Sequence, residues 1–215
     1  MNFMLPVIET FASIQGESTH AGRRCFFIRL AGCNLRCTYC DTTYAWDGGN
    51  MLSVSKLVAM ALDSGTALVE VTGGEPLIHE ETPLLLQSLL DAGMEVLLET
   101  NGSLPIAAVP AGVRKILDCK TPGSGMAEKN LFANWELLQS HDEVKFVVSS
   151  REDFDWSTDL IKRYSLPEKT ANLIFSPVWG KVTFEELARW VMECGLPVRM
   201  QLQMHKLIWG DKKGV

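Results

Sequence analysis

The stretch Ala31-Gly-Cys-Asn-Leu-Arg-Cys-Thr-Tyr-Cys40 holds three thiols in the spacing C-x-x-x-C-x-x-C, directly after a β-rich run at residues 25–30. Polar and charged residues lie between the cysteines, which predicts a loop and not a core strand. In folds built from alternating strands and helices, the loops that follow the strands carry the chemistry. The stretch therefore predicts a strand-to-loop junction of an α/β fold with a functional centre on it.

Three cysteines without a fourth favour a metal centre with one open position. A [4Fe-4S] cluster held by four cysteines transfers electrons, whereas one held by Cys33, Cys37 and Cys40 leaves one iron open. S-adenosylmethionine (SAM) can chelate that iron through its amino and carboxylate groups. A structural zinc site is an alternative, but it needs four ligands, and His20 and His79 have no ligand-like spacing. Three ordinary buried cysteines are the other alternative, which the polar loop disfavours.

Composition indicates one cytoplasmic domain spanning residues 1–215. The chain is 47% hydrophobic with a net charge of −6 and a pI near 5.3, and it has no basic cluster, so a nucleic-acid partner is not expected. No apolar run is long enough for a membrane span, and no secretion signal opens the chain. Cys25, Cys119 and Cys194 lie outside the cysteine loop and are expected to be small buried hydrophobic residues.

Short β-rich runs alternate with helical patterns, which is typical of a βα-repeating fold with a parallel sheet. Strands are predicted at 25–30, 67–71, 94–98, 114–117, 143–148, 172–175 and 198–203. One helix is predicted after an N-cap at Ser53, with a buried stripe through Val54, Leu57, Val58, Ala61 and Leu62. Another is predicted after Thr183, where Glu186 completes a capping box. Since a full (β/α)₈ barrel takes about 250 residues, we expect a partial, incomplete (β/α) barrel.

Further loops at strand ends offer glycines and polar groups to a ligand. Val71-Thr-Gly-Gly-Glu-Pro76 follows the second predicted strand, where glycines allow a ligand to approach the backbone closely. Residues 99–102 and 118–125 follow later strands, and Lys120, Ser124 and Ser176 are candidate cofactor-binding residues there. Polar loop ends without a ligand are the alternative for each of these residues.

The cysteine motif, with the aromatic Tyr39 before its last cysteine, resembles the radical SAM superfamily. This resemblance implies a partial barrel of the radical SAM type, with a [4Fe-4S] cluster and SAM as cofactors. It assigns Gly73, Gly74 and Glu75 to the element that holds the SAM amino group. Tyr39, Cys40 and Asp41 are likewise expected beside the cofactor.

The whole chain resembles the 7-carboxy-7-deazaguanine synthase family through four segments: Phe11-Ala-Ser-Ile-Gln-Gly-Glu17, Phe27–Cys37, Cys40-Asp-Thr-Thr-Tyr-Ala-Trp46 and Leu202-Gln-Met-His-Lys206. One departure is Ser18, which stands where that family has a glycine. The resemblance implies conversion of 6-carboxy-5,6,7,8-tetrahydropterin to 7-carboxy-7-deazaguanine with loss of ammonia, in 7-deazapurine and queuosine biosynthesis. A radical formed from SAM would take hydrogen from carbon 6 of the substrate.

The resemblance also assigns substrate-site and metal-site residues. Substrate contacts are expected at Ile14, Gln15, Gly16, Arg29, Thr72 and His205. Chemically, Gln15 could read the amide-like edge of a pterin, and Arg29 could bind its carboxylate through two parallel hydrogen bonds. The resemblance implies Mg²⁺ bound by the hydroxyl of Thr42, an ion that commonly keeps few protein contacts.

An electron donor such as flavodoxin or ferredoxin, and a homodimer, are further expectations from the family. Two other functions remain open at this stage. One is an activase of the radical SAM superfamily that makes a glycyl radical on a partner protein. The other is a metal-binding or electron-transfer module without catalysis, which a fully ligated cluster would support.

Overall fold

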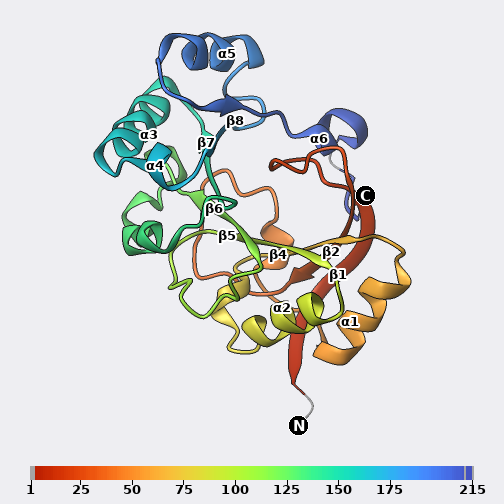
Figure 1. Ribbon diagram of the computed structural model, residues 1–215. Helices are drawn as coiled ribbons and strands as arrows, with labels where there is room; N and C mark the ends of the chain where they lie inside the picture. Colours follow the sequence, from red (N-terminus) through yellow and green to blue (C-terminus); the bar gives the residue numbers. More distant parts are fainter. Residues whose placement is uncertain (1–2, 211, 215) are drawn as a thin grey trace.

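The computed structural model describes residues 3–210 and 212–214, and one nine-stranded sheet runs through them (Figure 1). The strand order is β3-β1-β2-β4-β5-β6-β7-β8-β9. The strands are β1 Met4–Ile14, β2 Arg24–Leu30, β3 Asn50–Ser53, β4 Leu68–Gly73, β5 Glu95–Thr100, β6 Arg114–Cys119, β7 Glu143–Val148, β8 Asn172–Pro177 and β9 Arg199–Met200. From β2 to β9 all neighbours are parallel, whereas β1 pairs antiparallel with β2 and β3. The curved, open sheet confirms the predicted partial barrel.

Helices cover the outer face of this sheet. They are α1 Val54–Asp63, α2 Thr82–Asp91, α3 Arg151–Arg163, α4 Leu166–Lys169 and α5 Phe184–Glu193, whereas the last helix, α6 Met204–Trp209, lies at the cavity. In Figure 1, α1 and α2 lie together below β1, β2 and β4, while α3, α4 and α5 lie over the other half of the sheet. The main hydrophobic core fills the layer between helices and sheet. Among the described residues no helix has the length and apolarity needed to cross a bilayer.

Side chains along the parallel strands point alternately to this core and to the barrel interior. In β4, Val69 and Val71 belong to the core beneath the helices, whereas Leu68 belongs to a second cluster inside the barrel. That second cluster is Cys25, Phe27, Leu68, Leu97 and Ile116, with Phe11 packed against it. Phe11 stacks on Phe27 with ring centroids 4.9 Å apart. Because side chains of a strand alternate between faces, the residues two positions further along these strands also face the interior.

Most predicted elements are present, and two predictions need correction. The capping box at Thr183 and Glu186 begins α5 as expected, and Ser53 caps α1 by accepting a hydrogen bond from the Lys56 backbone N–H. Leu62, however, is half exposed and lies outside the buried stripe of α1. The strand predicted over 198–203 is wrong beyond Arg199–Met200, because the chain turns there into α6.

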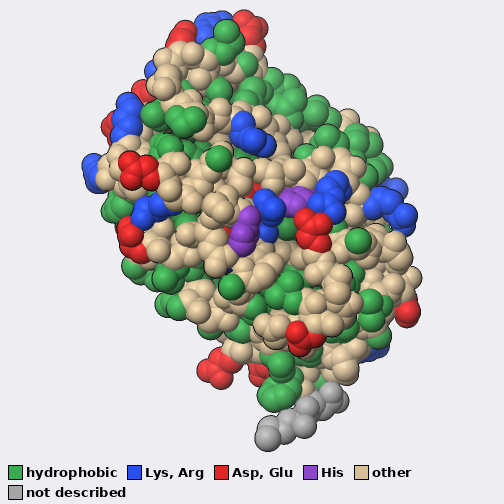
Figure 2. Space-filling view, in the orientation of Figure 1, with side chains coloured by type: hydrophobic (Ala, Val, Ile, Leu, Met, Phe, Trp, Pro, Cys, Tyr) green, Lys and Arg blue, Asp and Glu red, His purple; other side chains and the backbone are tan. Residues whose placement is uncertain are grey.

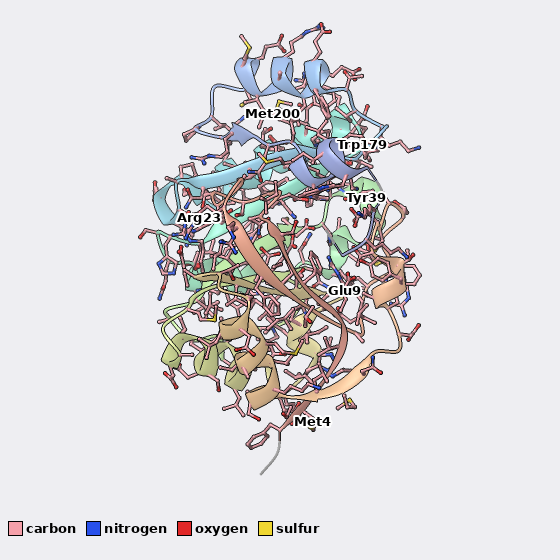
Figure 3. All side chains as sticks on the ribbon, turned by 90° about the vertical axis from the view of Figure 1, so that its right-hand side faces the viewer. Met4, Glu9, Arg23, Tyr39, Trp179 and Met200 are labelled. Carbon is pink, nitrogen blue, oxygen red and sulfur yellow. The ribbon has the colours of Figure 1, made fainter. Side chains whose placement is uncertain are left out.

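The sequence analysis did not predict strands β1 and β3. β1 carries half-buried residues on both faces, so it lacks the alternation that marks a strand in sequence. Figure 3 shows its length from Met4, at the lower end, past Glu9. It brings the N-terminal segment alongside β2 and so places Phe11 and residues 14–18 at the cavity.

The loop after β4 and the cysteine loop after β2 are in backbone contact. The Glu75 N–H donates to the Gly32 carbonyl oxygen at 2.8 Å. A Cβ atom on Gly74 would overlap that carbonyl oxygen and lie 2.8 Å from the Cβ of Cys33. Glycine at position 74 is therefore required for the two loops to lie this close.

Gly74→Ala should lower the free energy of unfolding by about 1–3 kcal/mol, because backbone atoms must move to admit the methyl group. Gly112→Ala is the matched control, since its Cβ would meet only the flexible Leu90 side chain at 3.2 Å. Denaturant unfolding of both variants measures the difference. Equal stability of Gly74→Ala and the unsubstituted protein would contradict the packing described here.

Candidate active site

A cavity of about 510 Å³ opens at the carboxyl ends of the strands. It reaches down to Phe11, Phe27 and Ile116 of the interior apolar cluster, and the loops after β2, β4, β5 and β6 surround its upper part. On the face drawn in Figure 2, basic and histidine side chains gather near the middle of the surface. Small, mostly pre-formed clefts of this kind are the usual ligand sites of α/β folds.

The three cysteines of the motif line this cavity together. Cys33, Cys37 and Cys40 are all partly buried and unpaired, so their sulfur atoms are free to bind metal. Burial raises the pKa of Cys33 and Cys37, an effect that the Leu35 N–H opposes at Cys33 and the Lys120 ammonium opposes at Cys37. A metal must displace these thiol protons, and a nearby cation assists because it stabilises the thiolate.

The donor set itself bears on which metal the three thiols suit. A structural zinc ion takes four protein ligands, whereas three cysteine thiolates are the donor set of a [4Fe-4S] cluster with one open iron. Cys33, Cys37 and Cys40, which line one cavity with free thiols, therefore fit such a cluster.

The loop after β4 presents backbone to the cavity. Gly73 and Gly74 line the cavity, and Gly73 has φ of 145°, which is favourable only for glycine. The carboxylate of Glu75 is fully buried and accepts hydrogen bonds from the Leu77 N–H, the Thr100 hydroxyl and the Asn101 N–H, at 2.7–2.9 Å. Glu75 thus fixes the shape of the loop, while the glycines face the ligand.

Arg29 faces the cavity from β2 with one side of its guanidinium already bonded. Its Nε donates to Glu9 on β1 at 2.8 Å, and the Tyr44 hydroxyl donates to the same oxygen at 2.8 Å. Burial and the neighbouring Arg29 act in opposite directions on Tyr44, with a net rise of its pKa to about 12. The tyrosine is therefore a hydroxyl donor at neutral pH, and the two terminal nitrogens of Arg29 are left for a ligand.

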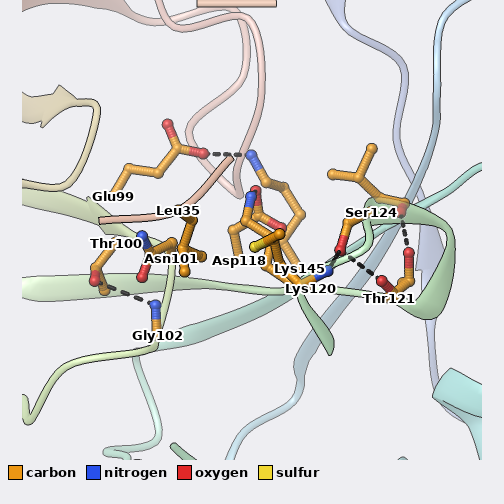
Figure 4. Close-up of polar contacts among 12 residues, drawn as sticks. Leu35, Glu99, Thr100, Asn101, Gly102, Asp118, Lys120, Thr121, Ser124 and Lys145 are labelled. Atoms are coloured by element: carbon orange, nitrogen blue, oxygen red, sulfur yellow. Dashed lines mark hydrogen bonds and ion pairs between the residues drawn. The ribbon is translucent and has the colours of Figure 1, made fainter. Parts of the chain in front are cut away.

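Deeper in the cavity, Lys145 of β7 binds two carboxylates. Its ammonium lies 2.9 Å from Glu17 Oε2 and also pairs closely with Glu99 of β5 (Figure 4). Burial alone would raise the pKa of Glu99, but the Lys145 ammonium lowers it overall. The Thr72 hydroxyl donates to the other oxygen of Glu99 at 3.2 Å. Three strands and the N-terminal loop are thereby joined by one buried charge network.

The C-terminal segment closes one side of the cavity. The Met204 N–H donates to the Gly16 carbonyl oxygen at 3.0 Å, and the Gln203 amide donates to Glu17 at 2.9 Å. The Lys206 ammonium lies 2.6 Å from Asp41 in the cysteine loop. Burial would raise the pKa of Asp41, but the Lys206 charge dominates and the pKa falls to about 2.

Ser18 occupies a left-handed turn in the N-terminal loop, with φ of 63°. Glycine adopts this conformation without strain, whereas a residue with a Cβ pays about 1–2 kcal/mol. The Ser18 hydroxyl accepts from the His20 N–H at 3.0 Å, and its carbonyl oxygen accepts from Gln201 at 2.6 Å. The loop therefore keeps its turn despite the substitution.

Most sequence-predicted site residues line this one cavity. They are Ile14, Gln15, Gly16, Arg29, Cys33, Cys37, Tyr39, Cys40, Asp41, Thr42, Thr72, Gly73, Gly74, Lys120 and His205. Glu75, Ser124 and Ser176 are fully buried and do not line it. The Ser124 hydroxyl donates to the Thr121 carbonyl oxygen, and the Ser176 hydroxyl has no partner among the described residues. Cys25 and Cys119 are buried as expected, whereas Cys194 is only half-buried.

The sequence analysis missed Glu9, Glu70 and Lys145. The last two interrupt apolar strands, Leu-Val-Glu-Val-Thr-Gly in β4 and Glu-Val-Lys-Phe-Val-Val in β7. A charge inside a buried parallel strand needs a partner, so such an interruption is a usable signal of an interior site.

Comparison with known proteins agrees with this geometry. Residues 27–121 match the radical SAM superfamily. The 7-carboxy-7-deazaguanine synthase of Chlorobaculum tepidum is 44% identical, over 98% of this chain and 97% of its own length. That of Koribacter versatilis is 40% identical, over 98% of this chain and 100% of its own.

The crystal structure of QueE from Escherichia coli shares the fold, with a TM-score of 0.76 and 21% identity over 94% of this chain and 95% of that one. The identity and coverage of the two sequence relatives show that the chain belongs to the 7-carboxy-7-deazaguanine synthase family of the radical SAM superfamily.

Proposed function

We propose that this chain converts 6-carboxy-5,6,7,8-tetrahydropterin to 7-carboxy-7-deazaguanine with release of ammonia. The observation that carries the proposal is one cavity lined by three free cysteines, a glycine loop and Arg29. The relatives that match over nearly the full chain bear the name of this activity.

Cys33, Cys37 and Cys40 would hold a [4Fe-4S] cluster, and Gly73 and Gly74 would receive SAM beside it. Their shared cavity and their free thiols support this assignment. When bound, the cluster and SAM supply the radical chemistry that begins at carbon 6 of the substrate.

The chain's own residues bind and orient the substrate. Arg29 would bind the substrate carboxylate through its terminal nitrogens, since Glu9 and Tyr44 hold its Nε side in place. His205 and the C-terminal segment cover the cavity from the side of Gly16, which limits access of water to the reacting atoms.

Thr42 would supply a hydroxyl ligand to Mg²⁺. It lines the cavity two residues after Cys40, and its hydroxyl now donates to Asp41 at 2.9 Å. Oxygen ligands are those that Mg²⁺ prefers, and an ion at this place could orient substrate oxygens during ring contraction.

We further propose a cytoplasmic homodimer that receives electrons from a flavodoxin or ferredoxin. The six free cysteines suit a reducing compartment. The homodimer and the electron donor are proposed from membership of the family alone.

The proposed function predicts product formation under anaerobic conditions. Reconstituted protein, SAM, Mg²⁺, a reductant and 6-carboxytetrahydropterin should yield 7-carboxy-7-deazaguanine, identified by mass spectrometry. Cleavage of SAM that is not stimulated by this substrate, with no deazaguanine product, would refute the proposal.

Cys33→Ala, Cys37→Ala and Cys40→Ala should each lose most of the cluster iron, because each removes one of three thiolate ligands. Cys25→Ala, Cys119→Ala and Cys194→Ala are matched controls outside the cavity and should retain about four iron atoms per chain. Iron and sulfide analysis after anaerobic reconstitution measures both groups. Retention of the full cluster by any of the first three variants would exclude that cysteine as a ligand.

Thr42→Ala should reduce turnover and its response to magnesium while leaving iron content unchanged, because it removes an oxygen ligand and no thiolate. Thr42→Ser keeps the hydroxyl and should retain the magnesium response. Titration of magnesium against product formation compares the three proteins. Identical curves for the alanine variant and the unsubstituted protein would remove Thr42 from the metal site.

A further inference from the structure

The floor of the cavity carries a carboxylate with no role in the function proposed above. Glu70 lies in the middle of β4, is 3% exposed and lines the cavity. It shares its face of the strand with Thr72, while Val69 and Val71 pack beneath the helices. A charged group in this position requires hydrogen bonds, because burial without them is costly.

Glu70 has few partners within the protein. The Gln15 amide donates to Glu70 Oε2, and no other hydrogen bond to this carboxylate occurs among the described residues. The carbonyl oxygen of the same amide accepts from the Glu17 N–H at 3.0 Å, which fixes its orientation. Gln15 thus holds Glu70 in place, and Glu70 Oε1 is left for a ligand.

The nearest cation is already engaged by other carboxylates. Lys145 binds Glu17 and Glu99, so Glu70 has no ammonium of its own. Burial raises the pKa of Glu70, and the charge of Glu99 raises it further. Burial and Glu99 thus disfavour the charged form of Glu70. N–H donors on a ligand would stabilise that charged form, so the site favours a ligand that carries them.

The position of Glu70 relative to Arg29 defines two ends of the cavity. In the pairing of β2 with β4, Arg29 lies opposite Thr72, and Glu70 lies opposite Phe27. Glu70 is therefore two residues, or roughly 7 Å, deeper along the strands than Arg29. A 6-carboxypterin has its carboxylate at one end and its 2-amino and N3 positions, both N–H donors, at the other.

We propose that Glu70 is a specificity-determining residue that accepts hydrogen bonds from the 2-amino and N3 positions of the pterin, with Gln15 as its positioning residue. The inference rests on the proposed pterin substrate and adds the group that recognises its pyrimidine edge. Arg29 and Glu70 then select opposite ends of one molecule. A two-point contact of this kind also fixes which face of the ring lies toward the cysteine loop.

Two ligands that differ at the 2-position test this assignment. Pterin-6-carboxylate carries the 2-amino donor, whereas lumazine-6-carboxylate has an oxygen there, which a carboxylate repels. Anaerobic titration calorimetry of the reconstituted protein with SAM should show roughly 10- to 100-fold tighter binding of the pterin. Glu70→Gln, which matches the size of the side chain, should lose most of this preference.

Two further variants separate recognition from general damage. Glu70→Asp keeps the charge and should keep the preference at lower affinity. Glu95→Gln makes the same change as Glu70→Gln at a half-exposed carboxylate outside the cavity, and should leave binding of both ligands unchanged.

The outcomes distinguish this inference from the proposed function. Equal affinity of the unsubstituted protein for both ligands, with normal product formation, would overturn the role of Glu70 alone, whether or not its variants fold. An equal loss of affinity for both ligands in Glu70→Gln would also overturn it. If neither ligand bound, the proposal that the substrate is a pterin would be overturned as well.

Discussion

The buried ion pairs of Lys145 hold the active-site cavity in its shape. The ammonium joins β7 to Glu99 on β5 and to Glu17 in the N-terminal loop. Glu17 in turn accepts from Gln203, so the C-terminal segment is attached to the same network. Removing one partner of a buried pair leaves an uncompensated charge, which commonly costs about 3–5 kcal/mol. The cavity, its N-terminal wall and its C-terminal cover therefore depend on one another.

The curved parallel sheet explains why the cavity changes from apolar at its floor to polar at its mouth. Residues two apart on β2 and β4 face the same space, so successive pairs form layers from floor to mouth. The lowest layer is apolar, with Cys25 opposite Leu68, and the next layer pairs Phe27 with Glu70, where the polar part begins. Arg29 and Thr72 lie one layer higher, and the cysteine and glycine loops complete the mouth. A ligand with N–H donors at its inner end and a negative charge at its outer end matches this order.

The local motifs were predictable from sequence, whereas the partners of the interior charges were not. The cysteine spacing, the glycine loop and the capping box of α5 each depend on neighbouring residues, and the structure contains all three. Lys145 and Glu99 are 46 residues apart and meet only because the sheet curves. β1 was missed because it lies at an irregular, half-buried part of the sheet, although it supplies Glu9, which holds Arg29. Such pairings between distant strands have no signature in a single sequence.

The central claim is that Cys33, Cys37 and Cys40 hold a four-iron cluster and leave one iron for SAM. Mössbauer spectra of protein reconstituted with iron-57, recorded before and after addition of SAM, test it most directly. The account predicts that the signal of one iron in four changes when SAM binds, while the other three are unaffected. Spectra with no four-iron cluster, or with a cluster whose four irons do not respond to SAM, would contradict it.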